Sequence, residues 1–221
     1  TSLNARLKEM QTSSLKTILV CCLLSISYIG NAQIPVINKA HASKFGELIV
    51  QDHRGRLKPV NTMCSEVLRK VAKKETLNDL NSEQIILSVM IDPVSWERQA
   101  LINIGSHPEV QKILNTSEKL VPYRNFFNEN GEYKLRDNVR NAQAMNPKDQ
   151  GTLEKTMIKL DEKVNITNMV FAGSLLRLFP LQGDPNNTWL APTDLMQENS
   201  NPVTGELKTM FISYLQVLSE A

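Results

Sequence analysis

Apolar side chains recur at steps of three and four over most of the sequence, a spacing that places them along one face of an α-helix. The longest stripe, near residues 152–179, predicts a helix of about 25 residues that ends before Pro180. Shorter stripes predict helices that begin near Asn61, at Asn81 or Ser82, near His107-Pro108 and near residue 205. The pattern therefore predicts a mainly α domain.

One short stretch follows a strand-like pattern instead. Leu48, Ile49 and Val50 favour a β-strand, and His53-Arg54-Gly55 supplies a turn, so we predict one small hairpin over residues 47–58. Asn130-Gly131 is the strongest turn signal in the chain. The proline-rich and asparagine-rich stretch 181–202 is expected to be loop.

The N-terminal part has the features of an export signal or a membrane anchor. No charge occurs between Lys16 and Lys39, and the apolar core runs from Ile18 to Ile29. A basic flank before this core and the small-residue ending at Ala32 favour a cytoplasmic N-terminus and export of the chain beyond Gln33. We predict a basic stretch over residues 1–16, a signal-like or transmembrane segment over 17–33 and an extracytoplasmic helical domain over 34–221. The alternative is a buried helix of a soluble protein.

Composition narrows the class of protein. Hydrophobic residues make up 41% and charged residues 22% of the chain, as in a globular protein. The formal net charge of +2 gives no broad basic surface, so nucleic acid is not an expected partner. The three cysteines form no C-x-x-C motif, which excludes a zinc ribbon and covalent attachment of c-type haem to this chain.

No catalytic motif is present, and few residues stand out as candidates for chemistry. His41 is the most interesting histidine because it lies soon after the apolar segment, whereas His53 and His107 fit a turn and a helix start. Cys64 lies on an apolar helical stripe and is read as a small core residue. Asp161 and Glu162, with Lys159 and Lys163 beside them, are predicted to form the solvent-exposed face of the long helix.

A basic cluster on the predicted hairpin is the candidate docking site. Arg54, Arg56 and Lys58 lie close together at its turn and return strand. Such cations suit a protein partner or a lipid headgroup, although exposed strands also carry charges as protection against edge-to-edge pairing. The sequence predicts no metal site and no catalytic residue.

Several ordered blocks resemble a known exported region. They are similar to the segment that joins the two halves of fused system II cytochrome c synthetases of the ResB–CcsA type, as found in Bacteroidetes. The first blocks are His41-Ala42-x-x-Phe45-Gly46, Leu48-Ile49-Val50-Gln51-Asp52, Gly55-Arg56-x-Lys58-Pro59-x-Asn61-Thr62 and Ser65-Glu66-x-Leu68-Arg69-Lys70. The later ones are Phe126-Phe127-Asn128-Glu129-x-Gly131-x-Tyr133-Lys134-Leu135, Asp161-Glu162-Lys163-Val164-Asn165 and Leu176-Arg177-Leu178-Phe179-Pro180.

The resemblance implies a part of a membrane machine that exports haem and attaches it to apocytochrome c. It implies an inner-membrane protein whose main domain lies in the periplasm, with the membrane halves and apocytochrome c as partners. The family carries its chemistry on a tryptophan-rich loop and on histidines near it, whereas this chain has only Trp96 and Trp189, far apart. We therefore expect an accessory domain that binds no haem itself; His41 is the residue that would ligate haem if this expectation failed. His53 departs from the family pattern.

A second interpretation stays open at this point. The chain could be a free-standing secreted helical binding module, cleaved after Ala32 and unrelated to haem. An enzyme in its own right is the least supported alternative, because no motif favours it.

Overall fold

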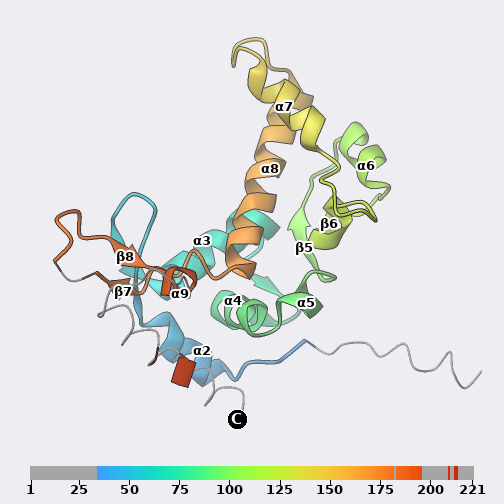
Figure 1. Ribbon diagram of the computed structural model, residues 1–221. Helices are drawn as coiled ribbons and strands as arrows, with labels where there is room; N and C mark the ends of the chain where they lie inside the picture. The colour runs from blue at the N-terminus through green and yellow to red at the C-terminus, as the bar shows by residue number, and fades with distance from the viewer. Residues whose placement is uncertain (1–33, 182, 196–208, 210–211, 214–221) are drawn as a thin grey trace, which may run out of the picture. The chain divides into compact units, whose positions relative to one another are not determined.

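The computed structural model describes residues 34–181, 183–195, 209, 212 and 213 (Figure 1). The signal-like segment at 17–33 lies outside the described residues. So does most of the helix predicted near 205–219, of which residues 209, 212 and 213 are helical. Within the described part, no helix combines the length and the apolar character that a membrane span requires.

The described chain is rich in helices, as the periodicity predicts. Local signals explain several of their starts. Asn81 caps its helix with a capping box, in which its side chain accepts from the Gln84 N–H and the Gln84 side chain accepts from the Asn81 N–H. The helices are α2 (Lys39–Gly46), α3 (Val60–Ala72), α4 (Ser82–Ile91), α5 (Pro93–Trp96), α6 (Pro108–Leu114), α7 (Arg136–Ala144), α8 (Thr152–Phe171) and α9 (Pro192–Leu195), with a 3-10 turn at Tyr123–Phe126.

The strands of the described residues form small antiparallel hairpins. The hairpin predicted at 47–58 is present, and Asn130-Gly131 forms the expected turn between the bridged residues Phe127 and Tyr133. The prediction of a single hairpin was wrong, and the stretch 181–202, expected to be loop, contains β8 and α9. The pairs are β1 (Ile49–Gln51) with β2 (Leu57–Pro59), β3 (Thr76–Leu77) with β4 (Leu80–Asn81), β5 (Ala100–Asn103) with β6 (Leu120–Pro122), and β7 (Phe179–Pro180) with β8 (Trp189–Leu190).

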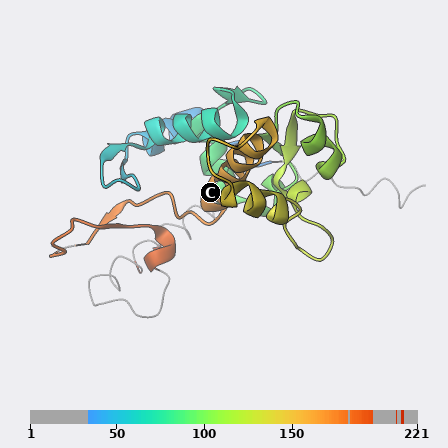
Figure 2. The ribbon, with the colours of Figure 1, turned by 90° about the horizontal axis from the view of Figure 1, so that it is seen from above.

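The main core lies where α3, α4, α8 and β5 meet. Leu68, Ile85, Ile102 and Leu160 are almost fully buried there, and Cys64 joins them as the small core residue that the helical stripe predicts. Figures 1 and 2 show the β7–β8 hairpin next to the β1–β2 hairpin. This contact is fixed by the Gln51 side chain, which donates to the Asn187 carbonyl and accepts from the Trp189 N–H.

The long helix is shorter than its sequence predicts. α8 begins at Thr152 but ends at Phe171 instead of continuing to residue 179. Gly173 adopts a φ of +68°, which side chains disfavour. The Ser174 N–H donates to the Met169 carbonyl and the Gly173 N–H to the Val170 carbonyl, the pair of bonds of a Schellman motif. A glycine C-cap therefore stops the helix although the apolar periodicity continues through Leu175.

Candidate functional site

A groove of about 810 Å³ runs between the β1–β2 hairpin, α3, α8 and residues 174–177. Its apolar lining comes from all of these elements. Two methionines, Met63 on α3 and Met169 on α8, contribute to this lining with Val67 and Ile166. Because methionine has a flexible and polarizable side chain, it adapts to partners of different shape. The groove is therefore an apolar surface suited to a polypeptide segment or a flat apolar molecule.

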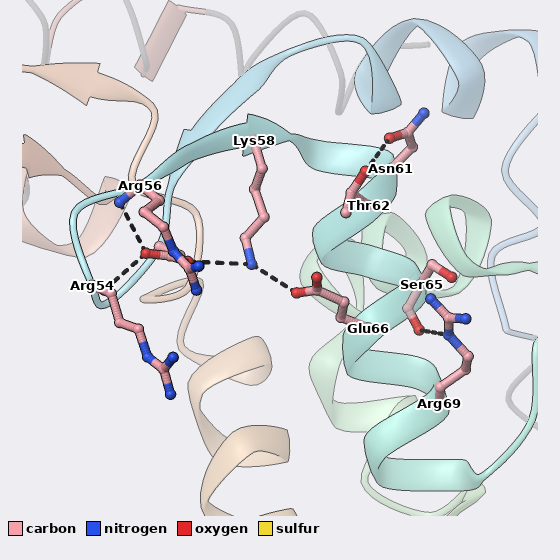
Figure 3. Close-up of polar contacts among 9 residues, drawn as sticks. Arg54, Arg56, Lys58, Asn61, Thr62, Ser65, Glu66 and Arg69 are labelled. Carbon is pink, nitrogen blue, oxygen red and sulfur yellow. Dashed lines mark hydrogen bonds and ion pairs between the residues drawn. The ribbon is translucent and has the colours of Figure 1, made fainter.

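A network of charges borders the groove at the hairpin end (Figure 3). Lys58 Nζ lies 2.7 Å from a Glu66 carboxylate oxygen and 3.6 Å from an Asp52 carboxylate oxygen. Asp52 also pairs with Arg56, whose Nε lies at 3.4 Å. The cations of the predicted docking cluster are thus partly neutralised by acidic neighbours.

Asp52 organises the hairpin turn. Its carboxylate accepts from the backbone N–H groups of Arg54 at 2.8 Å and Arg56 at 3.0 Å. The N–H of Arg56 is the largest single cause that lowers the pKa of Asp52, and the N–H of Arg54 and the charges of Arg56 and Lys58 add to it, so that the pKa falls to about 2. A charged carboxylate therefore holds the turn at neutral pH.

The opposite border of the groove carries a second ion pair. Lys70 Nζ of α3 lies 2.7 Å from a Glu162 carboxylate oxygen of α8, so this pair bridges the two helices. Asp161 lies next to Glu162 and accepts from the Asn165 side chain at 3.1 Å. Burial, and then the negative charge of Asp161, raise the pKa of the Tyr133 hydroxyl. The groove thus has an apolar floor and a rim of mixed charge.

The structure brings the three predicted docking residues together at one hairpin. Arg56 and Lys58 take part in the charge network, whereas the Arg54 side chain points away from it in Figure 3. Their role in docking stays a prediction. The interpretation of Lys163 as a solvated residue was wrong. Its side chain is buried against β5, and its ammonium group donates to the Asn103 carbonyl.

The three histidines lie apart. His41 is exposed on α2, and His53 is exposed in the hairpin turn. His107 precedes Pro108 at the start of α6, as predicted, and its buried Nδ1 has no hydrogen-bond partner among the described residues. No group of three His, Cys, Asp or Glu residues in the described part of the chain is placed to hold a metal ion. Burial also raises the pKa of the Cys64 thiol, which disfavours the reactive thiolate.

Comparison with known proteins finds one informative relative. The chain is similar to Protein NrfI of Wolinella succinogenes. The two are 34% identical over 195 residues, which cover 83% of this chain and 22% of NrfI. The chain therefore spans about a fifth of the length of this relative. No family model matches the chain.

The similarity to NrfI includes the whole groove. A stretch that covers 83% of a 221-residue chain necessarily contains residues 40–180, and the groove is lined by residues between Val50 and Arg177. Sequence reasoning found the hairpin cations but missed the groove floor. Met63 and Met169 lie more than a hundred positions apart, and no local signal shows that α3 and α8 pack side by side.

Proposed function

We propose that this chain is an accessory extracytoplasmic domain of a membrane protein that acts in cytochrome c biogenesis, where haem is attached to c-type apocytochromes. The similarity to NrfI supports a role in cytochrome c biogenesis. The blocks that resemble the region between the halves of system II synthetases support the finer assignment. In this proposal the protein lies in the inner membrane, with residues 34–221 in the periplasm and residues 17–33 as the signal-like or transmembrane segment.

The observation that carries the docking role is the groove, with its apolar floor and its rim of mixed charge. An apolar channel with polar borders is the usual surface for an amphipathic segment of a partner protein. The partner in this proposal is apocytochrome c or one of the membrane halves of the same protein. The hairpin residues Arg54, Arg56 and Lys58 border the groove or lie beside it, so they would contact the same partner.

The proposed domain handles the partner and not the haem. His41 is exposed on α2 and does not line the groove, while His53 lies at the groove edge in an exposed turn. Burial is one of the means by which a protein controls a bound haem, and an exposed histidine does not supply it. Haem is therefore the cofactor of the complete protein in this proposal, and no residue of this chain holds it.

The test introduces a charge into the groove of the full-length protein. Met169 lines the groove and is half-buried, so Met169→Lys should leave the fold intact but weaken docking of an apolar segment about tenfold, as loss of an interface hot spot does. The measurement is the yield of covalently attached haem in a c-type cytochrome, normalised to the amount of full-length protein. We expect the yield to fall.

Two further variants make the test specific. Val94→Lys changes an exposed apolar residue of α5 outside the groove and should keep the yield of the unmodified protein. His41→Ala should leave the haem absorbance of the purified complex unchanged. Equal yields for Met169→Lys and Val94→Lys would refute the groove as the docking surface. A loss of the haem absorbance in His41→Ala would make this domain a haem-handling site.

A further inference from the structure

The outer face of the β1–β2 hairpin is apolar and exposed. Ile49 keeps 43% and Leu57 keeps 56% of their surface accessible, and the neighbouring Leu48 keeps 46%. These three are among the eight exposed large apolar residues in the described part of the chain. Exposed apolar side chains that cluster on one small element indicate a surface that binds a membrane or another molecule.

Ile49 and Leu57 lie outside the lining of the groove. Ile49 pairs with Pro59 and Gln51 with Leu57 in the antiparallel register, so Ile49 and Leu57 lie on the same side of the hairpin. Val50 and Lys58 pair with each other on the opposite side, and both line the groove. Neither Ile49 nor Leu57 lines it. Gln51 shares this side of the hairpin but lines the groove and is buried, so Ile49 and Leu57 alone form the exposed apolar part of this side.

The same part of the chain carries an excess of positive charge over the residues that follow it. Residues 34–58 contain five lysines and arginines against Glu47 and Asp52, a net charge of +3, whereas residues 59–221 sum to −3. Arg54 and Arg56 lie at the exposed tip of the hairpin, and the Arg56 side chain is 70% accessible. Arg56 pairs with Asp52, whereas the Arg54 side chain points away from the charge network in Figure 3. A cation beside an apolar face is the combination that binds the interface of an anionic bilayer.

We propose that the β1–β2 hairpin rests on a membrane surface, with Leu57 and Ile49 in the headgroup region and Arg54 and Arg56 on anionic phosphates. The lipid is favoured over a protein partner by charge complementarity, because residues 34–58 carry an excess of positive charge and residues 59–221 an excess of negative charge. The apolar stretch 18–29 lies shortly before residues 34–58 in the sequence. The inference does not rest on the proposed function: it shares Arg54 and Arg56 with the proposed docking site, but its apolar residues Ile49 and Leu57 do not line the groove.

The experiment reports lipid contact at single positions of the full chain. Cys64 is fully buried, so a background in which Cys21 and Cys22 are replaced by serine allows selective labelling of Leu57→Cys with bimane. Val94→Cys is the matched control, because Val94 is also apolar and 68% exposed but lies between Asp92 and Glu97. Both proteins are mixed with brominated phosphatidylglycerol or phosphatidylcholine vesicles, and the vesicle-bound fraction is isolated by flotation.

We expect strong quenching of the label at Leu57 on phosphatidylglycerol, weak quenching on phosphatidylcholine, and little at Val94 on either lipid. Arg54→Gln should lower the ratio of docked to undocked hairpin about fivefold, the usual contribution of one cation near an anionic surface. Equal quenching at the two positions, or failure of the chain to float with anionic vesicles, would overturn the proposal. So would equal quenching on both lipids. Protection of the Leu57 label from aqueous iodide without vesicles would show that protein covers this face, which also overturns it.

Discussion

Lys163 lies on α8 with its ammonium group buried against β5, where it donates to the Asn103 carbonyl. Burial is the main cause that lowers the pKa of Lys163, and the positive charges of Lys73 and Lys70 lower it further, to about 8. The negative charge of Glu162 opposes this shift. A lysine that the sequence places on a solvated face thus carries a desolvated charge in the folded protein.

Because Lys163 is buried, the protein is predicted to become more stable as the pH rises above about 8. Between about pH 8 and the ordinary lysine pKa of 10.5, the unfolded chain binds more protons at Lys163 than the folded chain does. The free energy of unfolding should therefore rise with pH across this window through Lys163. We expect the rise between about pH 7.5 and 9.5, measured by urea unfolding, to be smaller in Lys163→Met than in the unmodified protein. Lys159→Met, at an exposed position, should show the same rise in the free energy of unfolding as the unmodified protein. An equal rise in Lys163→Met would mean that the ammonium group is hydrated.

At the scale of the elements, the end of α8 depends on the backbone conformation of one residue. Gly173 has a φ of +68°, and a Cβ built there would meet only the Met90 Cε, at 3.9 Å. Space is therefore available for a side chain, and the conformation alone opposes it. Gly173→Ala should lower the free energy of unfolding by about 1 kcal/mol, the usual cost of the left-handed region.

The conservative variant separates this cause from others. Asparagine tolerates the left-handed conformation better than alanine does, so Gly173→Asn should keep most of the stability that Gly173→Ala loses. Urea midpoints of the three proteins measure the difference. Equal losses in both variants would point to packing against the side chain as the cause instead of backbone strain.

The elements that the sequence predicts well are those with a local signal. The capping box at Asn81 and the turn at Asn130-Gly131 act over a few residues, so the sequence shows them directly. The end of α8 was missed because Leu175 continues the apolar period past Gly173. The β5–β6 pair was missed because α6 lies between its strands, so no short turn marks it. Whether such strands form depends on their pairing in the folded protein, and the local sequence pattern does not reveal this pairing.

One part of the candidate site could be predicted from the sequence, and the other part could not. Arg54, Arg56 and Lys58 are close in sequence, and the predicted hairpin was enough to bring them together. The groove floor combines α3 with α8, and the bridge from Lys70 to Glu162 spans the same two helices. Which helices become neighbours depends on the burial of the complete core, so this part of the site needed the structure.

At the scale of the whole molecule, α4 holds the segment that leads into the domain. The Ser88 hydroxyl donates to the Pro35 carbonyl at 2.7 Å and accepts from the Trp96 Nε1 at 2.8 Å. The Gln84 side chain donates to the Ile37 carbonyl, also at 2.7 Å. Residues 34–38 contain no helix or strand, so these side chains of α4 provide their polar contacts with the core. A fully buried indole thus orients the serine that fixes this entry segment.

Removal of the Ser88 hydroxyl should loosen this segment. Ser88→Ala leaves both the buried Trp96 Nε1 and the Pro35 carbonyl without their partner, and an unsatisfied buried polar group costs about 1–3 kcal/mol. We expect a lower urea midpoint and faster amide hydrogen exchange at residues 36–38 than in the unmodified chain. Ser43→Ala, at an exposed position of α2, is the matched control and should change neither. If Ser88→Ala exchanged as slowly as Ser43→Ala, the Gln84 contact and the apolar packing of Ile34 would be sufficient to hold the segment.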